Sequence, residues 1–266
     1  MAYWITTFGS TSLSMVSPVQ DTGPGAAELG LVTLPGGGVH DPHGADGAPV
    51  RLPYRLVIEA DVVGADMAAM RTALYGLRAL QGQRDQLYRT PDDGALDSEW
   101  CWARLENLRI RRRAENLLNQ PVTLEFAVLS HPWSGADQTI DTVLDVTPKS
   151  IVCANDGNAR VTDIVVSVTA RTSAITELEV VADTPTGWMQ WAWSGTLAVG
   201  SKLEVDCGAQ TVRVDGVDDY GAWERNALHN VSEWLRFDPG NTTVTAERTG
   251  GGADTEIEIA YCDGWA

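Results

Sequence analysis

The sequence has little cysteine, and its four cysteines are widely spaced. They are Cys101, Cys153, Cys207 and Cys262, and no two form a Cys-x-x-Cys pair. This spacing argues against a zinc site or a thioredoxin-like motif. The even count leaves two disulfides open, but we expect free, mostly buried thiols, as in a protein made in a reducing cytosol.

Basic residues are also scarce. The chain has 19 Lys and Arg against 36 Asp and Glu, so its formal net charge is -17. Non-specific DNA binding needs clustered Lys and Arg to neutralise phosphates, and docking on an anionic membrane surface needs a basic patch. The charge therefore argues against both.

Long apolar runs are missing. No stretch reaches the roughly 20 apolar residues of a membrane-spanning helix. The first residues, Met1 to Ile5, contain neither the basic segment nor the apolar core of a secretory signal. We expect no secretory signal and no membrane partner.

Catalytic motifs are missing as well. The sequence contains no Gly-x-Ser-x-Gly, His-Glu-x-x-His, Walker-type or Rossmann-type pattern. His40 and His43 flank Asp41, but a metal site needs a third ligand in a fixed geometry, and an ordinary polar loop is the simpler interpretation. Gly250 to Gly252 lack the spacing of a phosphate-binding loop and indicate a turn. We expect no enzyme, no cofactor and no bound metal.

Strand patterns dominate what is present, with one helix among them. Met67, Met70, Leu74 and Leu77 recur at helical spacing, Asp66 can cap the start, and Gly82 lies where a C-terminal glycine belongs. The spacing predicts a helix over about 66–81. Strands are predicted around it, at 3–13, 54–60, 100–113 and 121–129.

The second half consists of short strand patterns separated by turn residues, which favours a sandwich or a barrel. The clearest strands are 164–170, 177–181, 189–193, 203–207, 211–214, 243–246 and 256–261. Near the C-terminus, a strand is predicted to end on Phe237, followed by a Pro239-Gly240-Asn241 turn and a further strand. His131 to Gly135 break the strand pattern, and we place the domain boundary just after them.

Three segments are candidates for contacts. The segment 17–50 is rich in Gly and Pro and is either a surface loop or an arm that reaches a neighbouring subunit; Leu31 and Leu34 would then be contact residues. The basic run Arg109, Arg111, Arg112 and Arg113 has three interpretations: a solvated strand face paired with carboxylates, an acid–base contact between subunits, or, least favoured, a nucleic-acid contact. Met189, Trp191 and Trp193 alternate onto one face, so core packing is the default, with sugar stacking or a subunit edge as alternatives for Trp188, Trp191 and Trp193.

The order of these segments resembles the distal tail proteins of long-tailed (siphovirus-type) phages or phage-derived particles. The motifs at 103–108, 124–126 and 132–133 are similar to the end of that family's tail-ring domain. The motifs at 203–206, 212–216, 235–241 and 256–261 are similar to its C-terminal sandwich.

The resemblance implies a mainly β, two-domain fold. Residues 1–136 would form an N-terminal β-sheet, split-barrel-like ring domain with one helix at about 66–81 and a long hairpin arm at about 17–50. Residues 137–266 would form a C-terminal galectin-like β-sandwich.

The resemblance also implies a structural function at the virion tail tip, after synthesis and assembly in the host bacterial cytoplasm. Family members form a homohexamer, a ring that joins the tail tube protein to the tail-tip hub protein. The ring leaves a channel for tape-measure protein and DNA, and receptor-binding or other tip proteins attach to the outer domain. An acidic lumen would let DNA pass without specific binding.

Two other functions stay open. One is a different tail component, such as a tail tube or adaptor protein. The other is a lectin-like carbohydrate-binding module that uses one of the three tryptophans, although a galectin-like shape alone does not supply sugar binding.

Overall fold

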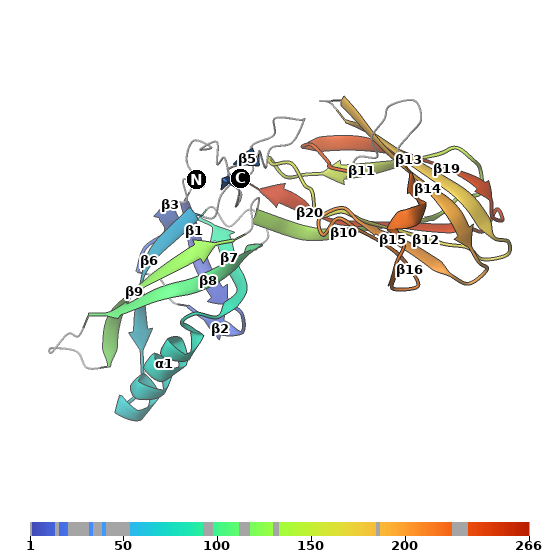
Figure 1. Ribbon diagram of the computed structural model, residues 1–266. Coiled ribbons are helices and arrows are strands. Elements are labelled where there is room, and N and C mark those ends of the chain that lie inside the picture. Colours follow the sequence, from blue (N-terminus) through green and yellow to red (C-terminus); the bar gives the residue numbers. More distant parts are fainter. Residues whose placement is uncertain are drawn as a thin grey trace. The chain divides into compact units, whose positions relative to one another are not determined.

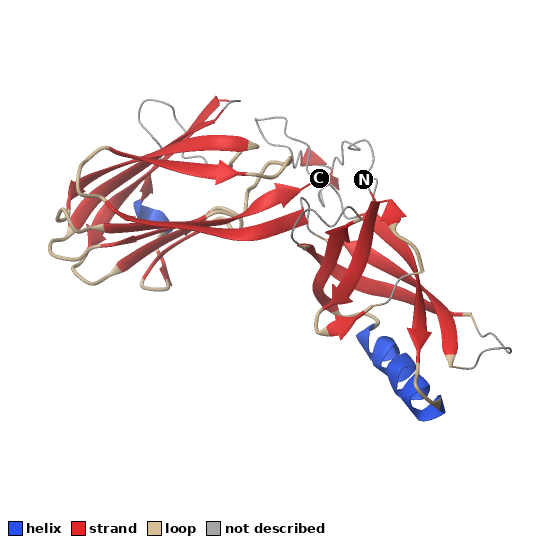
Figure 2. Cartoon of the chain, turned by 180° about the vertical axis from the view of Figure 1, so that it is seen from behind, coloured by secondary structure: helices blue, strands red, loops and turns tan. Residues whose placement is uncertain are grey.

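The computed structural model describes residues 2–13, 16–20, 32–33, 39–40, 54–92, 98–111, 118–129, 133–184, 187–224 and 234–265 (Figure 1). The chain divides into two compact units, which we call unit 1 (Met1–Ser134, with Ala266) and unit 2 (Gly135–Trp265). Strands make up most of the described chain and α1 is its one α-helix (Figure 2). The predicted mainly β fold is confirmed.

Unit 1 is built on one antiparallel sheet with the strand order β6-β9-β8-β7-β1, and β2 and β3 both pair with β1. The strands are β1 (Ala2–Phe8), β2 (Thr11–Ser12), β3 (Val19–Gln20), β6 (Tyr54–Val63), β7 (Arg84–Pro91), β8 (Glu99–Ile110) and β9 (Asn119–Val128). A separate pair, β4 (Val32–Thr33) and β5 (Val39–His40), is antiparallel and lies within the predicted arm.

Apolar and polar residues alternate along the strands, which explains why one face of this sheet is buried. In β6, Leu56 and Ile58 are buried, whereas Arg55, Val57 and Glu59 between them are exposed. Successive side chains of a strand point to opposite faces, so this segment can bury one face only.

The predicted helix is confirmed as α1 (Met67–Leu80). The Asp66 carboxylate accepts hydrogen bonds from the backbone N–H groups of Ala68 and Ala69, each at 2.8 Å. Gly82 follows the helix with φ of 85°, as the sequence predicts for a C-terminal glycine. The predicted apolar face is narrower than expected: Met70 and Leu77 are buried, but Met67 is 42% exposed.

Unit 2 contains two antiparallel sheets that lie face to face (Figure 1). The first has the order β17-β16-β15-β12-β20-β10, and the second β11-β19-β13-β14-β18. The strands of the first are β10 (Trp133–Val143), β12 (Val165–Thr169), β15 (Lys202–Asp206), β16 (Thr211–Val214), β17 (Val217–Asp218) and β20 (Glu256–Trp265). Those of the second are β11 (Lys149–Asn155), β13 (Ile175–Thr184), β14 (Gly187–Leu197), β18 (Trp223–Glu224) and β19 (Gly240–Gly250).

One apolar core lies between these two sheets. It includes Trp191 and Val244 from the second sheet and Leu203 and Ile259 from the first. Sheets that bury their inner faces against each other in this way form a β-sandwich.

Two local predictions are wrong. Residues 133–135 do not break the strand pattern, because β10 begins at Trp133. The Trp133 side chain is fully buried, which favours a strand here over the expected turn. The segment ending on Phe237 forms only an isolated bridge with Val161 and no strand. The turn after it is as predicted: Gly240 has φ of 94°, and β19 starts there.

Candidate subunit-contact site

Two residues of the arginine run are described: Arg109 lies near the end of β8 and Arg111 directly follows this strand, and both side chains lie on the exposed face of the unit 1 sheet. Arg109 pairs with Glu125 of β9 at 3.1 Å, and Arg111 pairs with Glu59 of β6 at 3.2 Å. The two arginine side chains are 68% and 67% exposed. These pairs match the solvated-face interpretation, and the exposure leaves both guanidinium groups accessible to a second molecule. Arg112, Arg113, Leu31 and Leu34 lie outside the described residues.

A third ion pair extends this charged face across the central strand. Arg55 of β6 contacts Glu106 of β8 at 3.3 Å, although β9 lies between the two strands. The contact passes over a small side chain, since Ala127 of β9 is in register with Arg55. Exposed ion pairs of this kind each contribute about 0–1 kcal/mol to folding stability. These pairs therefore give the face its pattern of charge but add little to the stability of the sheet.

The buried face of the same sheet contains an ion pair that the sequence did not predict. Arg89 Nε donates to a Glu99 carboxylate oxygen at 2.6 Å, and both side chains are 1% exposed. The guanidinium group lies between the rings of Tyr3, at 3.9 Å, and Trp133, at 4.1 Å. Arg89 alternates with the buried Leu87, which is the one signal in the sequence that could have indicated its inward direction.

The tryptophan stretch of unit 2 is mainly core. Trp191 and Trp193 are 0% and 1% exposed. Trp193 Nε1 donates to Asp219 at 3.0 Å, and the Trp191 ring stacks on Trp223 at 5.2 Å. Burial leaves no ring face of either residue open to a sugar. Trp188 is 47% exposed, so sugar stacking stays a prediction for this residue alone.

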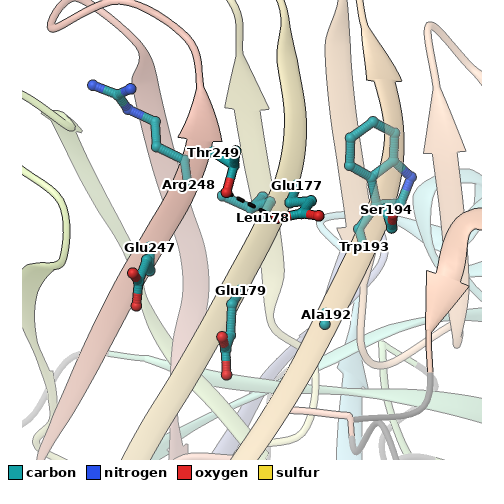
Figure 3. Close-up of a pocket in the computed structure, with 9 residues that line it drawn as sticks. All are labelled: Glu177, Leu178, Glu179, Ala192, Trp193, Ser194, Glu247, Arg248 and Thr249. Carbon is teal, nitrogen blue, oxygen red and sulfur yellow. Dashed lines mark hydrogen bonds between the residues drawn. The ribbon is translucent and has the colours of Figure 1, made fainter. Parts of the chain in front are cut away.

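The outer face of the second sheet has a depression of about 270 Å³ lined by three glutamates (Figure 3). Glu179 of β13 lies directly opposite Glu247 of β19, and the Thr249 hydroxyl donates to Glu177 at 2.9 Å. Burial raises the pKa of Glu179, and the facing Glu247 carboxylate adds to the increase. The Arg248 guanidinium does not neutralise these acids, because it donates to the backbone carbonyls of Leu144, Gly250 and Gly251.

The titratable groups of the described residues offer no metal centre or activated thiol. No group of three or more His, Cys, Asp or Glu side chains in the described ranges could hold a metal ion. The four cysteines form no disulfide with one another, as the sequence predicts. Burial raises the pKa of the Cys153, Cys207 and Cys262 thiols to about 12, so they stay protonated and unreactive at neutral pH.

No helix in the described part of the chain is both long enough and apolar enough to cross a membrane.

Known proteins are similar to this chain in sequence family and in fold. Residues 156–265 match the family described as siphovirus-type tail component, C-terminal domain. The solved structure of the SPP1 Dit (gp 19.1) protein is similar to this chain, with 19% sequence identity and a TM-score of 0.58. The structural alignment covers 97% of this chain and 93% of the Dit chain. The baseplate of phage P2 in its activated conformation with Ca shares 7% identity over 78% of each chain, at a TM-score of 0.42. No curated protein matches the chain in sequence.

The family match lies in unit 2, and the fold likeness to the Dit protein extends over nearly the whole chain. The predicted resemblance is thereby confirmed: residues 156–265 match the C-terminal domain of siphovirus-type tail components, and the chain has the fold of the SPP1 Dit protein.

Proposed function

We propose that this chain forms a hexameric ring that joins the phage tail tube to the tail-tip hub. The ring leaves a channel for tape-measure protein and DNA. The observation that carries the proposal is the combination of a tail-component domain at 156–265 with a distal tail protein fold over 97% of the chain. A tail-component domain without unit 1 would fit many roles, whereas the two together fit a hub.

The partners follow from this role. The ring has two ends, one for the tail tube protein and one for the tail-tip hub protein, and receptor-binding or other tip proteins attach at its periphery. The chain acts at the virion tail tip after assembly in the host cytoplasm. The absence of a disulfide among the four cysteines is compatible with folding in a reducing compartment.

The net charge supports passage of DNA through the channel. At -17 per chain, six copies repel a polyanion and offer few clustered cations for phosphate. We assign the chain a structural role and no catalytic step, since the matching family is a tail component.

The oligomeric mass tests the proposal. Light scattering on a sizing column is expected to give about 172 kDa, six times the chain mass of 28.6 kDa. A monomer at every concentration would contradict ring formation by the chain alone. A polydisperse filament would favour the alternative role as a tail tube protein, because a tube subunit stacks without limit.

A further inference from the structure

Unit 1 has a second exposed patch next to the arginine run, at the β7–β8 pair. Three register pairs define it: Arg84 with Arg104, Gln86 with Trp102, and Tyr88 with Trp100. Paired residues of antiparallel strands point to the same face of a sheet. We call this patch the arginine–tryptophan face and define it by Arg84, Tyr88, Trp100, Trp102 and Arg104.

Two cations lie side by side on this face. Arg84 and Arg104 are exposed and directly opposite each other, and the Arg84 guanidinium lies 4.9 Å from the centre of the Trp102 ring. Neither arginine forms an ion pair with any carboxylate of the described residues, whereas the nearby Arg55, Arg109 and Arg111 all do. Like charges directly opposite destabilise a sheet, so an external carboxylate here would remove a repulsion and add charge-assisted hydrogen bonds.

The aromatic half of the face has the composition of a binding hot spot. Trp100 and Trp102 are half-buried and meet edge to face, with their ring centres 6.2 Å apart. The Tyr88 hydroxyl donates to the Gln86 side chain at 2.7 Å. The few residues that dominate binding energy in protein interfaces are enriched in Trp, Tyr and Arg, and here these three types lie together on one sheet face.

Unit 2 of the same chain has the opposite arrangement. Glu179 and Glu247 are directly opposite each other across β13 and β19, and Glu177 of β13 lines the same depression (Figure 3). No described cation pairs with these three side chains. We call Glu177, Glu179 and Glu247 the glutamate face. It is concave and acidic, and the arginine–tryptophan face is basic.

We propose that the arginine–tryptophan face of one copy of this chain binds the glutamate face of the next copy. This inference rests on the proposed ring and names one contact between its neighbouring subunits. A ring with cyclic symmetry needs two different surfaces on each subunit that fit each other, and these two faces meet that requirement by charge. Planar guanidinium groups bind carboxylates through two hydrogen bonds, so each unpaired arginine receives a partner.

Charge reversal tests the contact from both sides. Variant A carries Arg84→Glu and Arg104→Glu, and variant B carries Glu179→Arg and Glu247→Arg. Each is expected to raise the dissociation constant of self-association by about 30-fold or more, because each replaces attraction by repulsion at a desolvated charge pair. Sedimentation velocity over a concentration series measures this, and circular dichroism checks that both variants fold.

Mixing the two variants gives the decisive result. Variant A has two acidic faces and variant B has two basic faces, so neither fits itself but each fits the other. An equimolar mixture is expected to recover the wild-type mass, with the two variants alternating. A repacking or folding defect could not be repaired by mixing, so recovery separates the contact from a general loss of stability.

A matched control for variant A reverses two exposed arginines of α1, Arg71→Glu and Arg78→Glu, with the same change in net charge. For variant B, Glu204→Arg and Glu258→Arg reverse two acids on the other sheet of unit 2. Both controls are expected to keep the wild-type mass. An oligomeric wild-type chain whose variants A and B also stay oligomeric would overturn this contact and leave the ring intact. A wild-type chain that stays monomeric, with an equally monomeric mixture, would overturn both proposals.

Discussion

The two units differ most in their net charge and in where their charged side chains lie. The first 134 residues contain 11 basic residues, all of them arginine, against 15 Asp and Glu, a net charge of -4. The remaining 132 contain 8 Lys and Arg against 21 Asp and Glu, a net charge of -13. Unit 1 also places an arginine inside its core, whereas the core of unit 2 consists of apolar side chains such as Trp191 and Ile259.

This difference indicates that the two units are held together by different interactions. The core between the two sheets of unit 2 is apolar, and the ion pair of this unit that involves a buried carboxylate, Asp238 with Arg160, keeps a partly exposed arginine side chain. Unit 1 has arginines on both faces of one sheet, buried at Arg89 and exposed at Arg84 and Arg104. We infer that charge pairing contributes more to specifying the fold of unit 1 and apolar packing more to that of unit 2. Four predictions test this contrast.

The largest effect is expected from removing core volume in unit 2. Trp191→Ala should lower the free energy of unfolding by about 3–5 kcal/mol, because it removes a fully buried ring and leaves a cavity. Scanning calorimetry should show this loss in the transition of unit 2. Trp188→Ala is the control: its half-exposed ring predicts a change within about 0.5 kcal/mol. Equal losses from the two would contradict the core assignment.

Breaking the buried pair of unit 1 should cost a similar amount. Glu99→Ala leaves the Arg89 guanidinium buried without its carboxylate, which is expected to lower stability by about 3–5 kcal/mol. Replacing both residues, Arg89→Met with Glu99→Leu, should restore most of the loss, since no charge is then buried. Urea unfolding followed by circular dichroism measures both variants. A double variant as unstable as Glu99→Ala would show that charge pairing does not specify unit 1.

A smaller effect is expected at the start of α1. Asp66→Ala removes the acceptor for the N–H groups of Ala68 and Ala69 and should cost about 1 kcal/mol. Asp66→Ser, which keeps a capping oxygen, should lose much less. Thermal unfolding of both variants against wild type provides the measurement, and identical midpoints would exclude capping as the role of Asp66.

The smallest effect concerns the glutamate face and depends on pH. The pKa of Glu179 is raised in the folded chain above its ordinary value of 4.5. A carboxyl with a raised folded pKa makes a contribution to stability that is complete below the unfolded pKa and is lost as pH rises through the folded pKa. Glu179→Gln should therefore raise the melting temperature slightly at pH 7, and the gain should vanish near pH 3.5.

The isolated, low-concentration chain should be used for this comparison, because a subunit contact would reverse the sign. If Glu179→Gln lowers the melting temperature at pH 7 under those conditions, the repulsion between Glu179 and Glu247 is not the dominant interaction there.

Local patterns explain which parts of the fold could be predicted from the sequence. The helix could be located because apolar spacing, a capping aspartate and a terminal glycine agree at Asp66 and Gly82. The strands could be located because a strand with one buried face has alternating apolar and polar residues. The strand at Trp133 was missed because a proline and a glycine flank it, although the ring is fully buried.

The candidate contact site depended on information that the local sequence does not contain. The opposition of Arg84 and Arg104 requires the register of β7 against β8, and that of Glu179 and Glu247 requires pairing between distant strands. The basic run in the sequence predicted a possible subunit contact at Arg109 and Arg111, but both arginines form ion pairs within the chain. The unpaired arginines lie on different strands, so only the fold brings them together.

Electron microscopy of the purified oligomer is the most direct test of the ring. Two-dimensional class averages along its axis are expected to show six equal subunits around an open centre. A closed centre, a different symmetry or a helical stack would contradict the account.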